Sequence, residues 1–133
     1  MPLRLLALVL ADPCVDAKNA VERDTCLARA SNAAEVEMTR YLGAARKRAT
    51  ADGAAVAKAF EEAQARWLAF RKGECDAVYA HWQDGAVRGA KLLACRITLT
   101  EARTHWLWRA WLTYPDSTPP ILPEPGLSAD EPS

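Results

Sequence analysis

The side chains with the greatest chemical capacity in this sequence are its cysteines and histidines. They are Cys14, Cys26, Cys75, Cys95, His81 and His105. A catalytic cysteine needs a free thiolate beside a base, and a structural zinc site draws paired ligands about two to four residues apart. The sequence contains no CxxC pair and no HxxxH pair, and no motif places either histidine. We therefore expect no metal, no cofactor, no catalytic residue and no enzymatic activity.

The cysteines instead indicate disulfide bonds, because an even number of cysteines in a short exported chain usually forms a framework of bridges. Of the possible pairings, we prefer Cys14–Cys26 with Cys75–Cys95, because each bridge closes a local segment. The nested pairing, Cys26–Cys75 with Cys14–Cys95, stays open, because antiparallel helices would also place Cys26 and Cys75 at the same level.

The N-terminus supports export. Residues 1–11, MPLRLLALVLA, combine one arginine with an apolar run, and Val9 and Ala11 fit the positions before a signal-peptidase cleavage site. The run is shorter than a membrane span of about 20 residues and shorter than a typical signal peptide of about 15–30 residues. We interpret it as the end of an export signal with a misplaced start codon; the alternative is a helical turn packed on the core. We therefore expect a periplasmic or secreted protein that has no stable membrane span.

Length and composition predict one small helical domain. The chain has 133 residues, is rich in alanine and leucine, and carries 17 basic and 17 acidic residues. Residues 12–114 hold 16 basic and 13 acidic residues, so a mildly basic body is followed by an acidic tail. A clustered basic excess, which nucleic-acid binding requires, is absent from the sequence.

Apolar residues at helical spacing predict a helix-like stretch over 14–25 and long helices over 26–49, 54–79 and 87–112. Short connections between long helices predict antiparallel neighbours, hence an all-α, up-down three-helix bundle. Residues 114–133 contain six prolines and predict a disordered tail. The expected organisation is therefore a residual signal peptide (1–11), a helical domain (12–113) and a proline-rich acidic tail (114–133).

One stretch of the second long helix, QARWLAFRKGEC, carries an unusual polar strip. Gln64, Trp67, Arg71 and Cys75 recur at helical spacing along one side, and Phe70 flanks them. A semi-buried arginine needs carboxylate or carbonyl partners, and an antiparallel register brings Glu35 and Glu37 closest to Arg71. We interpret the strip as a polar seam between helices rather than a catalytic site.

The same residues resemble a known family. The pattern Q-x-x-W-x-x-F-R-x-x-x-C resembles the signature of the lysozyme inhibitor LprI-like domain, formerly a domain of unknown function. The segments CVDAKNAVERDTC, EVEMTRYLGAARKRA and CRITLTEARTHWL, the last with Thr100 and Arg103, resemble the family's other segments in the same order. One departure is the loop before Cys95, which reads DGAVRG where the family often has a Gly-Gly-Ser/Thr turn.

The resemblance implies a small exported helical protein of the bacterial envelope, joined by disulfides, and some members inhibit lysozyme. It carries over no catalytic residue. A first hypothesis is therefore a lysozyme inhibitor that acts through one of the two loops between helices, residues 49–53 or residues 81–89. The second loop offers Gln83, Asp84 and Arg88 as contact residues. The basic body argues against strong attraction to a basic lysozyme.

A second hypothesis is a structural or scaffolding envelope protein with an unknown protein partner. Trp106 and Trp108 point to different sides of a helix, and Trp111 lies near Trp108. Either a tryptophan pair is exposed for a partner, or the PPILP segment folds back over it, or a longer first helix covers it.

Overall fold

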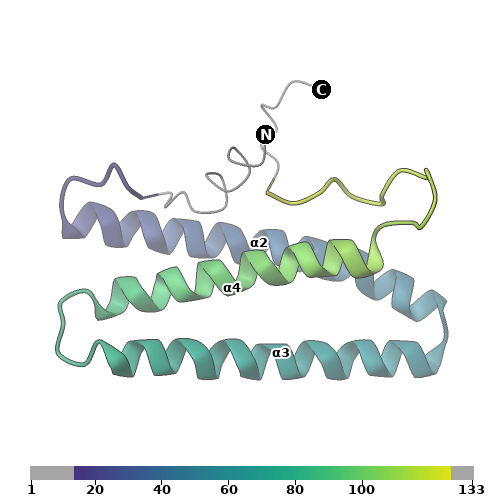
Figure 1. The fold of residues 1–133 in the computed structure, drawn as a ribbon, viewed down its shortest axis with the longest axis horizontal. Coiled ribbons are helices and arrows are strands. Elements are labelled where there is room, and N and C mark those ends of the chain that lie inside the picture. Colours follow the sequence, from purple (N-terminus) through teal and green to yellow (C-terminus); the bar gives the residue numbers. More distant parts are fainter. Residues whose placement is uncertain (1–13, 127–133) are drawn as a thin grey trace.

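The computed structural model describes residues 14–126 and consists of three antiparallel helices (Figure 1). Helix α2 spans Ala20–Ala51, α3 spans Ala54–His81, and α4 spans Arg88–Trp111. The predicted all-α, up-down-up bundle is confirmed, and the described part contains no strand. The export signal predicted for residues 1–11 lies outside the described residues. Within the described helices, none combines the length and apolarity of a membrane span.

The first long helix begins earlier than its apolar stripe suggested. The prediction of a separate helix-like stretch over 14–25 is wrong, because α2 starts at Ala20 and continues through Thr25 and Cys26 without a break. The side chain of Asn19 caps the helix by accepting a hydrogen bond from the Glu22 amide at 2.9 Å. The Glu22 carboxylate reaches back to the amide of Lys18, also at 2.9 Å. This reciprocal capping fixes the helix start.

The helices do not contribute equally to the core. Helices α2 and α4 share the most extensive contact, and α3 lies along one side of this pair (Figure 1). One apolar cluster fills the end that holds the α2–α3 turn; its buried members are Met38, Tyr41, Ala45, Ala49, Phe60, Leu107 and Leu112. A second cluster joins the starts of α2 and α4; its buried members are Cys14, Leu27, Ala90 and Ile97. Helix α3 buries only Phe60, Gln64 and Cys75.

The two disulfides follow the preferred local pairing. Cys14–Cys26 has a Cα–Cα distance of 5.8 Å, and Cys75–Cys95 one of 5.6 Å. The nested alternative is therefore wrong. Cys14–Cys26 links the segment before α2 to α2, and Cys75–Cys95 links α3 to α4. Each bridge restricts the unfolded chain and contributes about 2–4 kcal/mol to stability.

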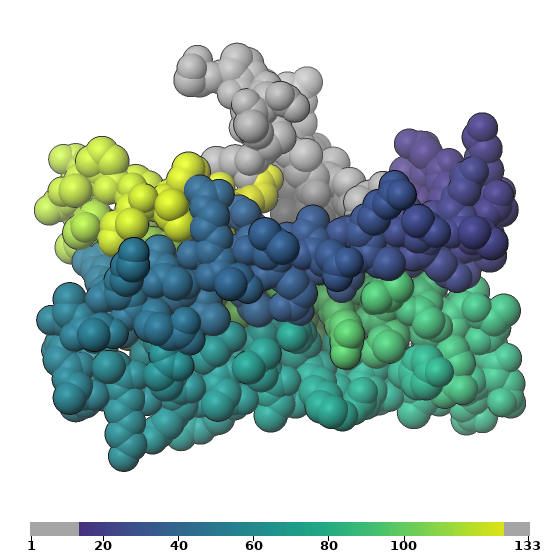
Figure 2. All heavy atoms as spheres, turned by 180° about the vertical axis from the view of Figure 1, so that it is seen from behind, coloured from purple at the N-terminus to yellow at the C-terminus, as the bar shows by residue number. Residues whose placement is uncertain are grey.

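The tail was predicted to be disordered over residues 114–133, and residues 127–133 lie outside the described residues. Residues 114–126 lie against α2 and α4 (Figures 1 and 2). They form no helix, as their prolines predict, but hydrogen bonds hold them. The Ile121 amide donates to the Leu112 carbonyl at 2.8 Å, and the Trp108 indole donates to the Leu122 carbonyl at 2.9 Å. The Tyr41 hydroxyl donates to the Pro123 carbonyl. Proline lacks a backbone N–H donor but keeps its carbonyl, so donors on other side chains can hold a proline-rich segment in place.

Apolar contact by the tail should contribute measurably to stability. Leu122 is half-buried and packs on the larger core cluster. We expect Leu122→Ala to lower the free energy of unfolding by about 1–2 kcal/mol, because a partly buried leucine loses both transfer energy and packing. Ile121→Ala is the matched control, since Ile121 is 44% exposed. Urea unfolding would measure both, and equal costs would contradict the anchoring role of Leu122.

The contact between Tyr41 and the tail should be sensitive to alkali. Burial, and after it the Glu37 carboxylate, raises the pKa of Tyr41 above its ordinary value of 10.0. A raised pKa means that the folded state favours the neutral phenol, so this stabilisation is present below pH 10 and is lost as pH rises through the folded pKa. The advantage of the wild type over Tyr41→Phe, about 1 kcal/mol near neutral pH, should shrink in urea unfolding above pH 10. An advantage independent of pH would contradict this assignment.

Candidate functional site

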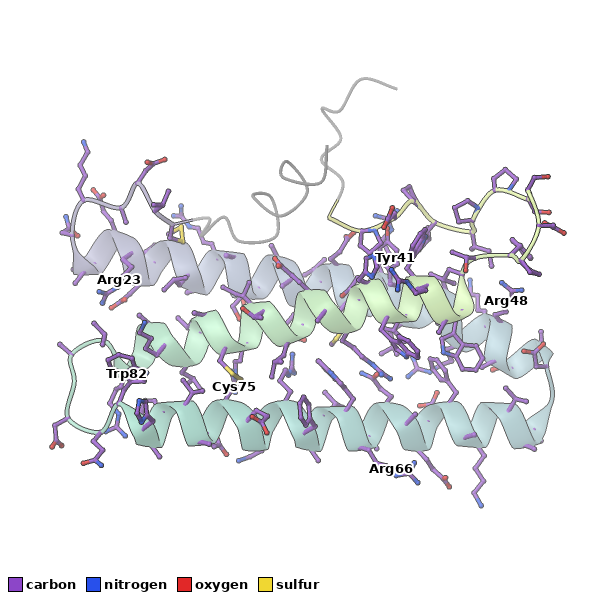
Figure 3. All side chains as sticks on the ribbon, viewed as in Figure 1. Arg23, Tyr41, Arg48, Arg66, Cys75 and Trp82 are labelled. Carbon is purple, nitrogen blue, oxygen red and sulfur yellow. A yellow bond between two sulfur atoms is a disulfide. The ribbon has the colours of Figure 1, made fainter. Side chains whose placement is uncertain are left out.

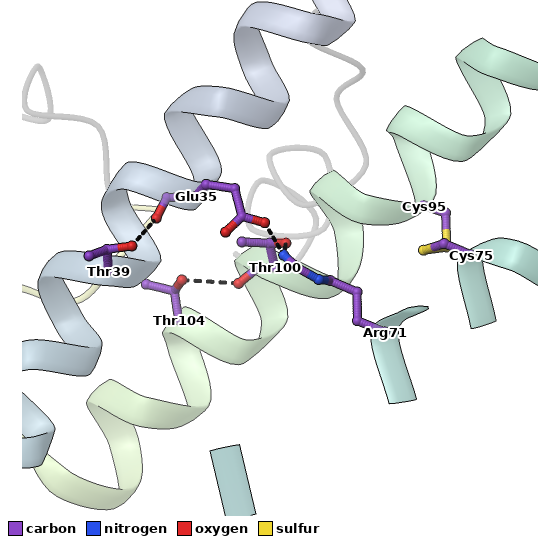
Figure 4. Close-up of polar contacts among 7 residues, drawn as sticks. All are labelled: Glu35, Thr39, Arg71, Cys75, Cys95, Thr100 and Thr104. Carbon is purple, nitrogen blue, oxygen red and sulfur yellow. Dashed lines mark hydrogen bonds and ion pairs between the residues drawn. A yellow bond between two sulfur atoms is a disulfide. The ribbon is translucent and has the colours of Figure 1, made fainter. Parts of the chain in front are cut away.

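The polar strip predicted on the second long helix lies where the three helices meet (Figures 3 and 4). Arg71 on α3 donates to the Glu35 carboxylate on α2, and also to the Thr100 hydroxyl on α4 at 2.8 Å. Its side chain is only 16% exposed. Of the two predicted partners, Glu35 is therefore the one that pairs with Arg71. Glu37 lies instead 3.7 Å from Arg40.

A second arginine completes the strip. The Arg103 Nε donates to the amide oxygen of Gln64 at 3.1 Å, across the α3–α4 interface. The Trp67 ring contacts both arginines, with its centre 4.9 Å from the Arg71 guanidinium carbon and 5.6 Å from that of Arg103. Burial lowers the pKa of Arg103. Both contacts have the geometry of cation–π interactions, which strengthen where water is excluded.

Two threonine hydroxyls support the strip from within the helices (Figure 4). Thr104 donates to the Thr100 carbonyl at 3.0 Å, and Thr39 donates to the Glu35 carbonyl at 2.8 Å. Gln64, Thr100 and Thr104 are buried. The bonds that Arg71 and Arg103 make to Glu35, Thr100 and Gln64 join different helices, so the arrangement specifies how the helices pack. It favours the seam interpretation over a catalytic one.

The aromatic residue predicted to flank the strip, Phe70, is 52% exposed. Trp67 and Arg71, on either side of it in the sequence, already fill the contact with α4 and α2. Phe70 therefore projects beside the seam, on a part of α3 that no other described element covers.

The α3–α4 loop, residues 82–87, is the second candidate surface. Gln83 has a φ of 29°, in the left-handed region that residues other than glycine rarely adopt. The Gly85 amide donates to the Trp82 carbonyl at 2.8 Å, and a Cβ on Gly85 would lie 3.0 Å from that oxygen. Trp82, Gln83 and Asp84 are exposed. The loop is thus fixed by its own hydrogen bonds while its tip faces solvent.

Two cations brace the base of this loop. The Arg88 guanidinium carbon lies 3.8 Å from the centre of the Tyr79 ring, and Arg88 donates to the Tyr79 carbonyl at 3.4 Å. The Lys91 ammonium lies 4.7 Å from the centre of the Trp82 ring. Sequence reasoning named Gln83, Asp84 and Arg88 but missed Trp82 and Lys91. An aromatic residue directly before a polar turn was the available signal.

The three C-terminal tryptophans separate into covered and exposed groups. Trp108 donates to the tail, and Trp111 packs edge-on against Phe60 with ring centres 5.1 Å apart. For Trp108, the alternative in which the PPILP segment folds back over the tryptophan is therefore the one that the structure has. Trp106 is 55% exposed.

The described residues offer open hollows rather than a deep cleft. One groove lies between α2 and the tail (Figure 2); its lining residues are Thr39, Arg40, Gly43, Ala44, Lys47, Arg48, Tyr114, Ile121 and Leu122. Residues 14–126 contain no group of His, Cys, Asp and Glu side chains arranged to hold a metal ion. The geometry supplies rigid outward-facing surfaces, which suit binding to another macromolecule.

A comparison with protein families gives one match. Residues 13–107 match the family described as Lysozyme inhibitor LprI. The matched segment contains both disulfides, the seam and the α3–α4 loop, and it ends before Trp108. No curated protein and no solved structure matches the chain.

The seam interpretation predicts a stability defect rather than an activity defect. In Glu35→Gln the Arg71 guanidinium keeps its position but loses its carboxylate partner, so the free energy of unfolding should fall by about 1–3 kcal/mol. Glu61→Gln is the matched control, because the Arg46–Glu61 pair joins two side chains that are 45% and 52% exposed. Its effect should be much smaller. Equal losses in urea unfolding would reject a structural role for the Glu35–Arg71 pair.

Proposed function

The chain belongs to the lysozyme inhibitor LprI family, and on that premise we propose that it is an exported binding protein that inhibits a lysozyme-type muramidase. It acts by blocking the active site of the enzyme and catalyses no reaction itself. Two disulfides within residues 14–126 support a location outside the reducing cytosol, in the periplasm or beyond. The family match and the bridges are independent observations that favour the same compartment.

The α3–α4 loop is our candidate for the inhibitory element. An inhibitor must present a convex, preformed element to a concave enzyme site, because ordering a flexible loop on binding costs affinity. The loop projects from one end of the bundle (Figure 1), and the Cys75–Cys95 bridge ties together the two helices that carry it. The left-handed conformation of Gln83 is the single observation that carries this assignment. Such conformations cluster at binding sites, where the surrounding structure maintains them.

The local charge of the loop suits a muramidase cleft. Lysozyme-type enzymes cut their substrate with two carboxylates. Arg88 and Lys91 lie at the base of the loop, and Asp84 is the one carboxylate at its tip. Local positive charge close to the catalytic carboxylates can thus offset the weak long-range repulsion between a basic body and a basic lysozyme.

Inhibition can be tested with purified, oxidised protein and an animal lysozyme acting on a bacterial cell-wall suspension. We expect molar excess of the wild type to suppress clearing of the suspension. Trp82→Ala should weaken inhibition at least tenfold, because an exposed aromatic residue at a loop is a typical binding hot spot. Asp52→Ala, in the turn at the opposite end of the bundle, should inhibit like the wild type.

Two outcomes distinguish the proposed function, lysozyme inhibition, from the proposed site, the α3–α4 loop. Unchanged clearing at large excess of the wild type would reject lysozyme inhibition. Inhibition by the wild type and equally by Trp82→Ala, Gln83→Ala and Asp84→Ala would retain the function but exclude the α3–α4 loop as its site.

A further inference from the structure

The α3–α4 face carries the most exposed aromatic residues among those described. Trp106 is 55% exposed and Phe70 is 52% exposed, whereas the other exposed aromatic residues lie at 38% or below. Exposed aromatic side chains are costly to solvate and mark interaction surfaces when they cluster. Neither ring takes part in the core clusters or in the α3–α4 loop.

Helical spacing and the contact between Arg103 and Trp67 place the two rings on the same side of the α3–α4 pair. Phe70 follows Trp67 by three residues on α3, and Trp106 follows Arg103 by three residues on α4, so each pair shares a helix side. The Arg103 guanidinium lies against the Trp67 ring and joins these two sides. We call the surface formed by Phe70, Trp67, Arg103 and Trp106 the aromatic–arginine face.

Arg103 lies on this face without an anionic partner. Its Nε donates to Gln64, but none of the ion pairs within residues 14–126 includes Arg103. The comparable half-buried Arg71 has Glu35, and Arg48 donates to the carbonyls of Trp111 and Thr113. A half-buried guanidinium is poorly hydrated and gains from a charged hydrogen-bond acceptor. Its terminal nitrogens make no hydrogen bond within residues 14–126 and are not among the buried unpaired atoms, so they reach solvent, where they can receive a carboxylate.

We propose that the aromatic–arginine face is a docking site for an acidic protein segment, in which a carboxylate pairs with Arg103 and flanking apolar side chains pack on Phe70 and Trp106. Aromatic residues and arginine around a partly desolvated centre are the composition of protein–protein hot spots. The charge requirement selects a partner with an aspartate or glutamate between apolar residues. This site is separate from the α3–α4 loop and does not depend on lysozyme inhibition.

Two short peptides that differ only in the carboxylate test the proposal directly. The probes are acetyl-Leu-Glu-Leu-amide and acetyl-Leu-Gln-Leu-amide, titrated into ¹⁵N-labelled protein while the tryptophan indole N–H signals are recorded by NMR. We expect the glutamate peptide to shift the Trp67 and Trp106 signals and to bind about tenfold more tightly than the glutamine peptide. Added salt should reduce that difference.

Matched variants decide which groups are responsible. Arg103→Gln should reduce the difference between the peptides to less than twofold, whereas Lys72→Gln should leave it intact. Lys72 is an exposed cation on the same helix as Phe70, and at a spacing of two residues it faces a different side of that helix. Trp106→Ser should weaken both peptides, and Trp82→Ser, at the end of α3, should weaken neither. A near-ultraviolet circular dichroism spectrum like that of the wild type establishes that each variant is folded.

Three results would overturn the proposal. Equal affinity for both peptides would remove the role of charge. Signal changes at Trp82 or Trp111 but not at Trp106 would place binding elsewhere. Shifts of the Trp106 signal with protein concentration alone, before peptide is added, would identify a second copy of the chain as the occupant.

Discussion

The packing of this bundle depends on one partly buried cation, the guanidinium of Arg71. It is the group through which all three helices meet, because it bonds to Glu35 on α2 and Thr100 on α4 while lying against Trp67 on its own helix. Helix α3 buries few apolar residues, so apolar contact alone specifies its position weakly. A directional network restricts the register of α3 more tightly than additional apolar area would.

The Cys14–Cys26 bridge and the tail restrict the parts of the bundle that this network does not reach. Cys14–Cys26 lies at the start of α2, where the smaller core cluster joins α2 to α4. At the opposite end the tail replaces a fourth helix: Leu122 packs on the larger cluster, and Arg48 binds the last carbonyls of α4. The hydrogen bonds that the tail makes with Tyr41, Trp108 and Leu112 let this short segment cover one end of the core.

Local periodicity predicted most of the fold, and the antiparallel register predicted Glu35 among the partners of Arg71. Helical spacing predicted the helices and placed Gln64, Trp67 and Arg71 on one side of the second long helix. The preference for bridges that close local segments predicted the disulfide pairing. The cap at Asn19 was visible in the sequence as Asn-x-x-Glu and was overlooked. The order of the tail was not accessible, because it depends on donors from Tyr41 and Trp108 that are remote in sequence. The exposure of Phe70 also depends on how helices cross, which periodicity does not specify.

The boundary of the family match has a structural consequence. The match ends at residue 107, but the core does not, since Leu112 is fully buried and Leu122 lies against the same cluster. The family segment therefore contains the seam, both disulfides, the α3–α4 loop and the aromatic–arginine face. Residues beyond it cover the end of the bundle near Tyr41. The part shared with the family is the part that carries both candidate binding surfaces, and the tail stabilises that part without contributing to either surface. Variation in such a tail can alter stability while the binding chemistry is retained.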